Sequence, residues 1–154
     1  MPDRDDAAAL DLREVMPGDP AAQTASARYF AEIDARFPGG FDPGAPDQVG
    51  TFVVAVHEGE PVAYGGVRAL SVELGEIKRM WVAPAWRGTG LGSRMLSHLE
   101  GLAARLGHDR VVLDTNGTLT EAIAMYESKG YTRIERYNDN PYAEAFFAKD
   151  LHAS

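Results

Sequence analysis

The second half of the chain carries an apolar stripe at helical spacing. Five apolar residues follow one another at intervals of 4, 4, 3 and 4, namely Leu91, Met95, Leu99, Leu102 and Leu106. This spacing places them on one face of a helix, and the glycine at position 107 is suited to end it. The same kind of pattern predicts a first helix over residues 20–37 and a shorter helix over residues 119–129.

Runs of β-branched and aromatic residues predict the strands. Residues 51–57 and 62–70 are typical of a hairpin, with a bulge expected at Gly65 and Gly66 inside its second strand. A short strand over residues 111–113 and two closing strands over residues 131–136 and 143–149 follow. With one strand before the first helix, this order indicates an α+β or mixed α/β domain.

Residues 75–82 form a further strand in which charged and apolar positions alternate. One face is expected to carry Glu76, Lys78, Met80 and Val82, and the other Ile77, Arg79 and Trp81. A row of charges on one face of a strand must meet water or a cleft.

Composition and charge narrow the class of protein. The chain has 154 residues, a formal net charge of −8 and no cysteine. Disulfides, thiol nucleophiles and cysteine-based metal sites are therefore excluded, and with four scattered histidines no metal site is expected. The negative charge disfavours binding to nucleic acid or an anionic membrane. We expect a single domain over residues 1–154, frayed over residues 1–7, located in the cytoplasm.

A glycine-rich turn over residues 84–93 lies directly between the charged strand and the long helix. The first amides of a helix have no partner within the helix and lie at the positive end of its dipole, so this turn suits a phosphate group. Arg87 adds a cation. A ligand-free turn is the alternative, and the spacing fits neither a P-loop nor a dinucleotide-binding fingerprint.

The turn resembles the pyrophosphate loop of the GNAT N-acetyltransferase superfamily. Three blocks in order carry the resemblance: residues 87–92 (RGTGLG) match the loop, residues 76–84 the strand before it, and residues 122–131 a helix ending in Tyr-x-x-x-Gly-Tyr. The resemblance is to the bacterial branch acting on small amines or amino acids. It implies a mostly antiparallel, twisted sheet of about seven strands, splayed at its centre and flanked by about four helices.

The resemblance also implies that acetyl-CoA is a co-substrate and which residues bind it. The pantetheine arm is expected to lie along Met80, Trp81 and Val82. The diphosphate is expected on the turn, formed by Arg87, Gly88, Thr89, Gly90, Leu91, Gly92 and Ser93. Asn116 is a further candidate for contact with the cofactor, although it comes earlier than the asparagine of many relatives.

Two residues are candidates for catalysis. Glu76 holds the strand position of the general base that deprotonates the amine in several relatives, and an ion pair with Lys78 or Arg68 is its alternative role. Tyr126 matches the helix tyrosine that protonates the departing thiolate, with ordinary aromatic packing as its alternative. Because the chain has no cysteine, direct transfer from acetyl-CoA to the amine is expected.

Of all the features of the predicted reaction, the acceptor substrate is the one that the sequence determines least. Its pocket is expected between the first helix, the loop over residues 38–46 and the closing strands. Residues 137–151 resemble the endings of bacterial GNAT proteins associated with small amines or amino acids, and this resemblance favours the primary amine of a small molecule. A protein lysine or N-terminus, or a CoA-binding sensor without turnover, remains an alternative. A homodimer also stays open.

Overall fold

The computed structural model describes residues 2–36, 50–115, 120–140 and 143–151. These residues form four α-helices: α1 (Arg4–Ala8), α2 (Pro20–Arg36), α3 (Leu91–Arg105) and α4 (Thr120–Ser128). They also form seven strands: β1 (Arg13–Val15), β2 (Thr51–His57), β3 (Glu60–Ala69), β4 (Leu74–Val82), β5 (Arg110–Thr115), β6 (Thr132–Arg133) and β7 (Ala145–Asp150). None of the described helices is both long enough and apolar enough to cross a membrane.

The seven strands make one mixed sheet in the order β1-β2-β3-β4-β5-β7-β6. Only β4 and β5 are parallel, and every other neighbouring pair is antiparallel. The α+β fold with a mostly antiparallel seven-stranded sheet and four helices is therefore confirmed within the described residues.

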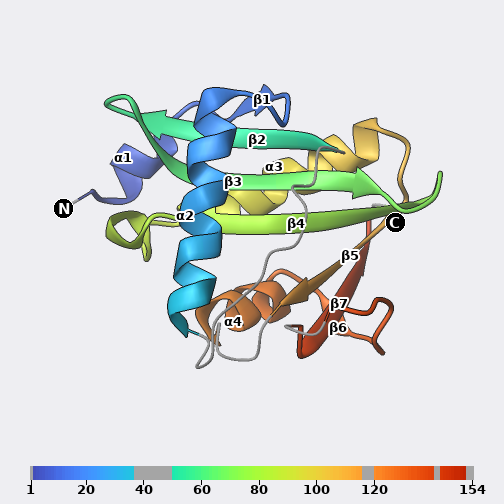
Figure 1. Cartoon of the computed structure of the whole chain (residues 1–154). Coiled ribbons are helices and arrows are strands. Elements are labelled where there is room, and N and C mark those ends of the chain that lie inside the picture. The colour runs from blue at the N-terminus through green and yellow to red at the C-terminus, as the bar shows by residue number, and fades with distance from the viewer. Residues whose placement is uncertain (1, 37–49, 116–119, 141–142, 152–154) are drawn as a thin grey trace.

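Helices cover both faces of the sheet (Figure 1). Helix α2 crosses one face over β2, β3 and β4, and α3 lies on the opposite face. The apolar stripe of α3, including Leu91, Met95 and Leu99, is fully buried in the larger core. A smaller core on the α2 face packs Ala25 of that helix against the sheet. The periodicity that predicts α3 thus marks the face that it buries.

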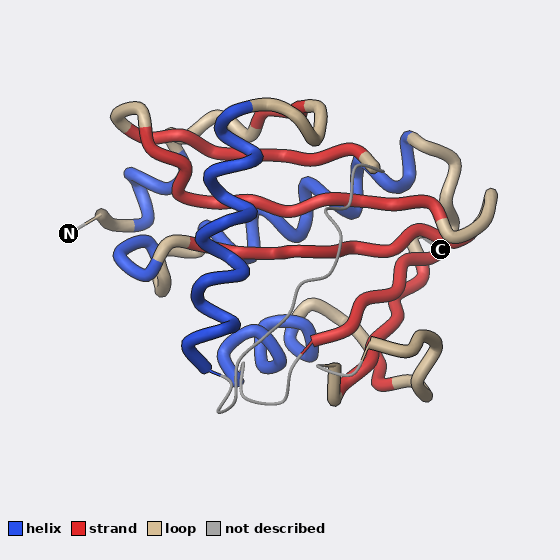
Figure 2. The backbone as a smooth tube through the Cα atoms, in the orientation of Figure 1, coloured by secondary structure: helices blue, strands red, loops and turns tan. Residues whose placement is uncertain are grey.

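The sheet opens between its two parallel strands. The pairing of β4 with β5 ends at Glu76 opposite Val112. Strand β5 pairs with β7 along its whole length, so beyond Val112 it is paired only with β7. Figure 2 shows β5 turning away from β4 beyond this point. Among the described residues, the edge of β4 from residue 77 to 82 has no strand partner on this side. Its backbone groups can therefore pair with a ligand.

A bulge in β4 changes which side chains share a face. Tyr64 pairs with Trp81 but Gly66 pairs with Lys78, so β4 contains one residue more than β3 over this stretch. The extra residue is accommodated at Arg79, whose φ is 57°. The bulge was expected in β3 at the paired glycines, but the extra residue lies opposite them in β4.

The predicted alternation along β4 is consequently wrong beyond Lys78. Ile77 lies in the core on the α3 side, whereas Trp81 lies in the core on the α2 side. The two were expected on one face. The extra residue at Arg79 reverses the alternation for the rest of the strand, because side chains alternate with a period of two.

The paired glycines of β3 make room for side chains on both faces of the sheet. A Cβ at Gly65 would lie 2.7 Å from Cδ1 of Leu99, on α3. A Cβ at Gly66 would lie 2.4 Å from the ring of Phe52, which is fully buried and stacks on Tyr64. The centre of the sheet therefore excludes even a methyl group at these positions.

Gly66→Ala is expected to lower the free energy of unfolding by about 1–3 kcal/mol, because the Phe52 ring must leave its packed position. Urea denaturation measures the change. The matched control is Gly101→Ala on the exposed side of α3, where a Cβ meets nothing within 4 Å. That variant is expected to gain up to about 1 kcal/mol from helix propensity. Equal effects of the two substitutions would contradict the packing described here.

The acidic head, for which fraying over residues 1–7 stays a prediction, includes the short helix α1. Asp3 and Asp6 form a reciprocal capping box at the start of α1. Ala7 is buried, and the Arg94 guanidinium of α3 donates hydrogen bonds to the carbonyl oxygens of Ala7 and Leu10. Capping and this anchor hold the segment against the domain.

The strand predicted over residues 131–136 is shorter in the structure. Strand β6 contains only Thr132 and Arg133. Farther along, the Arg136 guanidinium donates to the carbonyl oxygens of Asn140 and Ala143, both at 2.9 Å. These bonds hold the segment after β6 as a loop, which brings Tyr137 back to β4.

Candidate active site

A cavity of about 480 Å³ lies where β4 leaves β5, between α2, α4 and the first turn of α3. Nine of the residues expected from the sequence line it: Met80, Trp81, Val82, Arg87, Gly88, Gly90, Gly92, Ser93 and Tyr126. The other lining residues are Tyr29, Glu32, Ile33, Glu121, Ala122 and Met125. The structure thus brings together the β4 edge, the glycine-rich turn and the α4 tyrosine, which are distant in sequence.

Three of the expected residues do not line the cavity, and a fourth lies outside the described residues. Leu91 is buried in the core, and Thr89 is buried in the turn, where its hydroxyl donates to the Trp86 carbonyl oxygen at 2.5 Å. Both therefore shape the turn without lining the cavity. Glu76 does not line it either, and Asn116 lies outside the described residues, as does the loop over residues 38–46.

The glycine-rich turn presents bare backbone at the cavity. Gly88 and Gly90 have φ values of 80° and 88°, a region that favours glycine. Gly90 is the N-cap of α3 and has no side chain to cap the helix, and the Thr89 hydroxyl accepts only from the Leu91 amide, at 3.4 Å. The first-turn amides at Gly92 and Ser93, which line the cavity, are thus left for a ligand.

The cation of the turn is held by an acidic residue of α2. The Arg87 guanidinium donates to the Val82 carbonyl oxygen at 3.0 Å and to Oε1 of Glu32 at 2.5 Å. Both members of this ion pair line the cavity. An anion bound at the turn therefore shares Arg87 with Glu32 or displaces it.

Tyr126 presents a protonated phenol to the cavity. Its ring packs between Tyr131 and Phe147, with both ring centroids 5.8 Å away, and the residue is buried. Burial raises the pKa of Tyr126 above its ordinary value, and the charges of Tyr29 and Asp114 raise it further. The phenol therefore stays a hydrogen-bond donor at neutral pH.

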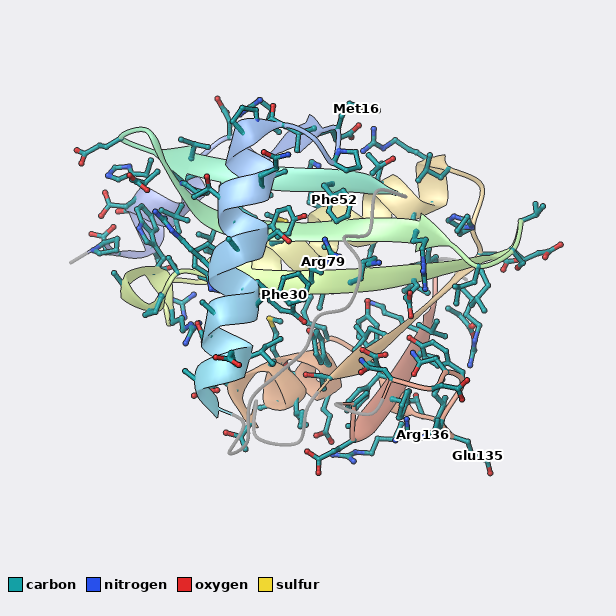
Figure 3. All side chains as sticks on the ribbon, in the orientation of Figure 1. Met16, Phe30, Phe52, Arg79, Glu135 and Arg136 are labelled. Carbon is teal, nitrogen blue, oxygen red and sulfur yellow. The ribbon has the colours of Figure 1, made fainter. Side chains whose placement is uncertain are left out.

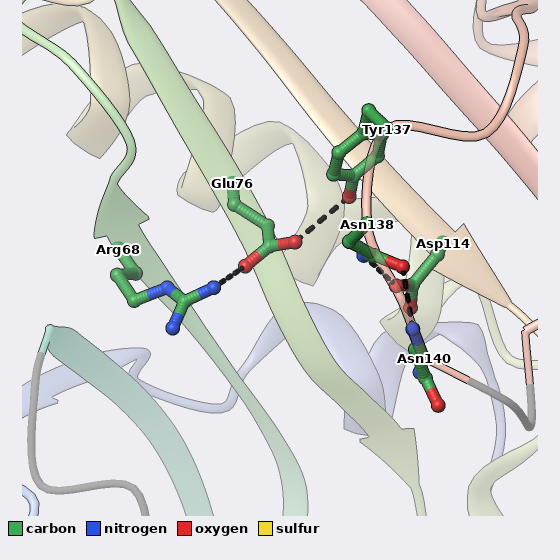
Figure 4. Close-up of polar contacts among 6 residues, drawn as sticks. All are labelled: Arg68, Glu76, Asp114, Tyr137, Asn138 and Asn140. Atoms are coloured by element: carbon green, nitrogen blue, oxygen red, sulfur yellow. Dashed lines mark hydrogen bonds and ion pairs between the residues drawn. The ribbon is translucent and has the colours of Figure 1, made fainter.

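Glu76 has a partner at each carboxylate oxygen (Figure 4). Arg68 donates to Oε1 at 2.7 Å, and the Tyr137 hydroxyl donates to Oε2 at 2.8 Å. The side chain is only 8% exposed. The ion pair with Arg68 is the alternative that the sequence left open. The role of Glu76 as general base stays a prediction, and in the structure each of its carboxylate oxygens accepts one hydrogen bond.

A second carboxylate, which sequence reasoning missed, lies near the site. Asp114 of β5 accepts a hydrogen bond from the Asn138 side chain at 2.6 Å, and the Asn138 oxygen accepts from the backbone amide of Asn140 at 3.0 Å (Figure 4). An aspartate at the end of an otherwise apolar strand was the signal available. Its link to Asn138 spans 24 residues, so no local pattern reveals it.

The two basic residues at the bulge have different surroundings. Arg79 extends toward α2, where its guanidinium lies 4.9 Å from the centre of the Phe30 ring (Figure 3). Lys78 is half-buried. Burial and the charge of Arg79 lower the pKa of Lys78 to about 8, against the opposing effect of Asp114.

A sequence profile described as the acetyltransferase (GNAT) family matches residues 20–131. The chain belongs to this family. It is 35% identical over 85 residues to the uncharacterized N-acetyltransferase YjgM of Escherichia coli, covering 53% of this chain and 51% of that protein. It is also 35% identical over 82 residues to the IAA acetyltransferase of Azospirillum brasilense, covering 52% and 53%. The GNAT chain thus spans about half the length of these curated relatives.

Solved structures share the fold over nearly the whole chain. An acetyltransferase of the GNAT family from Staphylococcus aureus superposes with a TM-score of 0.78 at 16% identity, covering 92% of this chain and all of that one. A GNAT family acetyltransferase from Elizabethkingia anophelis, solved with acetyl-CoA bound, gives 0.63 at 14% identity, covering 92% and 97%.

Proposed function

We propose that the chain is an N-acetyltransferase that moves the acetyl group of acetyl-CoA directly to the primary amine of a small molecule. One observation carries the proposal: a single cavity joins the uncapped end of α3, the open edge of β4 and the Tyr126 phenol. Membership of the GNAT family supports it, as does a solved member of that fold with acetyl-CoA bound.

The residues of the cavity fit acetyl-CoA from its diphosphate to its thioester. The diphosphate is placed on the amides at Gly92 and Ser93, where the helix dipole favours negative charge. A Cβ at Gly92 would contact the side chains of Met125 and Val82 at 3.4–3.5 Å, and both of these residues line the cavity. The backbone at Gly92 therefore lies directly at the cavity wall. The pantetheine amides pair with the open edge of β4 at Met80 and Val82, which directs the acetyl group toward Tyr126.

The chemistry assigns roles to the chain's own side chains. The amine must lose a proton before it attacks, and the thiolate that leaves needs a hydrogen bond or a proton. The Tyr126 phenol supplies the latter. Since the chain contains no cysteine, the acetyl group passes to the amine without an acyl-cysteine intermediate.

Two measurements test the function. Calorimetry with acetyl-CoA measures cofactor binding, and a thiol-release assay with a panel of small primary amines and a lysine-containing peptide measures transfer. We expect binding and a rate of thiol release that rises with a small amine. Transfer to the peptide alone favours a protein acceptor, and binding without any transfer favours a CoA sensor. Either result contradicts the proposal.

Glu32→Gln is expected to tighten acetyl-CoA binding about 2–5-fold, because an ion pair of this kind is worth roughly 0.2–1 kcal/mol and its loss frees Arg87 for the diphosphate. The dissociation constant from calorimetry measures the effect. Glu60→Gln is the matched control. Glu60, on β3, forms an ion pair with Arg28 of α2, and neither residue lines the cavity. Weaker binding by the Glu32 variant would show that Glu32 does not compete with the cofactor.

A further inference from the structure

Asp114 lies just past the point at which the sheet opens. The last β4–β5 pair is Glu76 with Val112, and Asp114 comes two residues later on β5. Leu113 faces the core on the α3 side, so Asp114 faces the opposite side of the sheet, the side on which α2 lies over β2, β3 and β4. The carboxylate therefore borders the opening from the side away from α3.

The loop before β7 holds this carboxylate in one orientation. Asn138 donates to Asp114 Oδ2, and its own side-chain oxygen is fixed by the backbone amide of Asn140. Arg136 donates to the carbonyl oxygen of Asn140. A half-buried carboxylate with such support is oriented in advance for a ligand.

Asp114 acts electrostatically on both phenols of the cavity. Tyr29 and Tyr126 come from helices on opposite faces of the sheet, and both line the cavity. After burial, the charge of Asp114 contributes to the raised pKa of each. Asp114 does not itself line the cavity, but it interacts electrostatically with two phenols that do.

We propose that Asp114 binds the protonated amine of the acceptor and takes its proton, so that the acceptor class is a compound with a primary ammonium group. This inference rests on the proposed function and deepens it. Glu76 is then a positioning residue: with Arg68 it holds Tyr137, the residue next to Asn138. A proton on Glu76 would weaken its ion pair with Arg68.

Lys78 shows what these surroundings do to a primary ammonium group. Its pKa is lowered to about 8 by burial and by Arg79, although Asp114 opposes the change. For an acceptor ammonium bound beside Asp114, we expect burial and the nearby cations to favour loss of the proton, while the carboxylate binds the ammonium and opposes that loss.

Four titratable groups on neighbouring elements interact electrostatically with Asp114. They are Lys78 on β4, Tyr29 on α2, Tyr126 on α4 and Tyr137 in the loop before β7. The three phenols are protonated at neutral pH, since burial raises the pKa of each. Among these four neighbours, Lys78 is thus the one whose pKa lies near neutral pH.

The transfer step balances with these residues. The acceptor ammonium gives one proton to Asp114, and the freed lone pair on nitrogen forms the bond to the acetyl carbon. The carbon–sulfur bond breaks with its electron pair on sulfur, which takes the proton of Tyr126 while the phenol oxygen takes the second proton lost by nitrogen. The products are the amide and the free thiol, and Asp114 releases its proton to water.

The test compares Asp114→Asn with Glu76→Gln on two kinds of amine from the panel. One is an alkylamine accepted by the wild type and protonated at pH 7.5, and the other an arylamine that is neutral there. We expect Asp114→Asn to lower kcat/KM for the alkylamine by about 100-fold or more and for the arylamine by less than about 10-fold. Glu76→Gln is expected to lower both by a similar, smaller factor, as a positioning residue does.

Two controls distinguish loss of the proposed role of Asp114 from damage to the fold. Asn is isosteric with Asp and can still accept from Asn138, so the acetyl-CoA dissociation constant of Asp114→Asn is expected to stay within about 2-fold of the wild type. Asp114→Glu, which keeps the carboxylate, is expected to recover part of the alkylamine activity. An equal loss with both amines, or no recovery by the glutamate variant, overturns the assignment.

The remaining outcomes are also decisive. Full alkylamine activity in Asp114→Asn overturns the inference and leaves the proposed function intact. Selective loss of the alkylamine in Glu76→Gln assigns the base to Glu76 instead. A wild-type protein that binds acetyl-CoA but acetylates no member of the panel contradicts the proposed function itself.

Discussion

Gly92→Glu is expected to weaken acetyl-CoA binding by about 100-fold, since a carboxylate beside a bound diphosphate costs about 1–4 kcal/mol per pair of charges near a protein surface. Gly92 lies in the first turn of α3 and lines the cavity. Its φ is not in the left-handed region, so the substitution adds charge and bulk without backbone strain. Calorimetry with acetyl-CoA measures the loss.

Two further variants isolate the cause. Gly101→Glu adds the same charge to the same helix in open space, and we expect binding within about 2-fold of the wild type. Gly92→Gln adds similar bulk without charge, so its loss is expected to be clearly smaller than that of the glutamate variant. If Gly92→Glu binds acetyl-CoA as tightly as Gly101→Glu, the diphosphate is not at this turn.

Tyr126→Phe is expected to lower kcat by about 100-fold while the acetyl-CoA dissociation constant stays nearly unchanged, because a positioned proton donor typically contributes 10²–10⁴-fold in rate. The buried ring remains and only the hydroxyl is lost. Burial raises the pKa of Tyr126, so the phenol is protonated throughout the neutral range. The rate of the wild type should therefore show no alkaline decline from this group near neutral pH. Rate profiles against pH for both proteins measure this.

Tyr131→Phe is the matched control for the loss of a buried hydroxyl. The Tyr131 hydroxyl donates to Glu100 at 2.9 Å and the residue does not line the cavity. Its loss is expected to cost about 1 kcal/mol of stability and to leave kcat within about 2-fold. Equal kcat values for the two variants would remove Tyr126 from the chemistry.

Elements with a strong local pattern could be predicted from the sequence. Helix α3 follows from its apolar stripe, and the β2–β3 hairpin from its β-branched runs and turn. The reversal of faces along β4 could not, because it depends on the backbone of one residue, Arg79, which has no local signature. Strand β6 was overestimated for a similar reason: the bonds of Arg136 to the chain beyond it compete with the sheet.

The residues of the site also differ in how far the sequence can predict them. The turn over residues 87–93 is contiguous, so its glycines and its place before a helix suffice to predict a phosphate-binding end. The environment of each carboxylate depends on partners distant in the chain. Tyr137, which holds Glu76, is 61 residues away from it, and the pairing of Arg87 with Glu32 spans 55 residues. These long-range contacts decide which carboxylate already has a hydrogen-bond or ion-pair partner, and only the folded chain shows them.

A crystal structure of the chain with acetyl-CoA tests the central claim most directly. The account predicts the diphosphate within hydrogen-bonding distance of the backbone amides at Gly92 and Ser93, with the pantetheine along Met80–Val82 and the sulfur beside the Tyr126 hydroxyl. A diphosphate bound elsewhere, or crystals that take up no acetyl-CoA at saturating concentration, would contradict it.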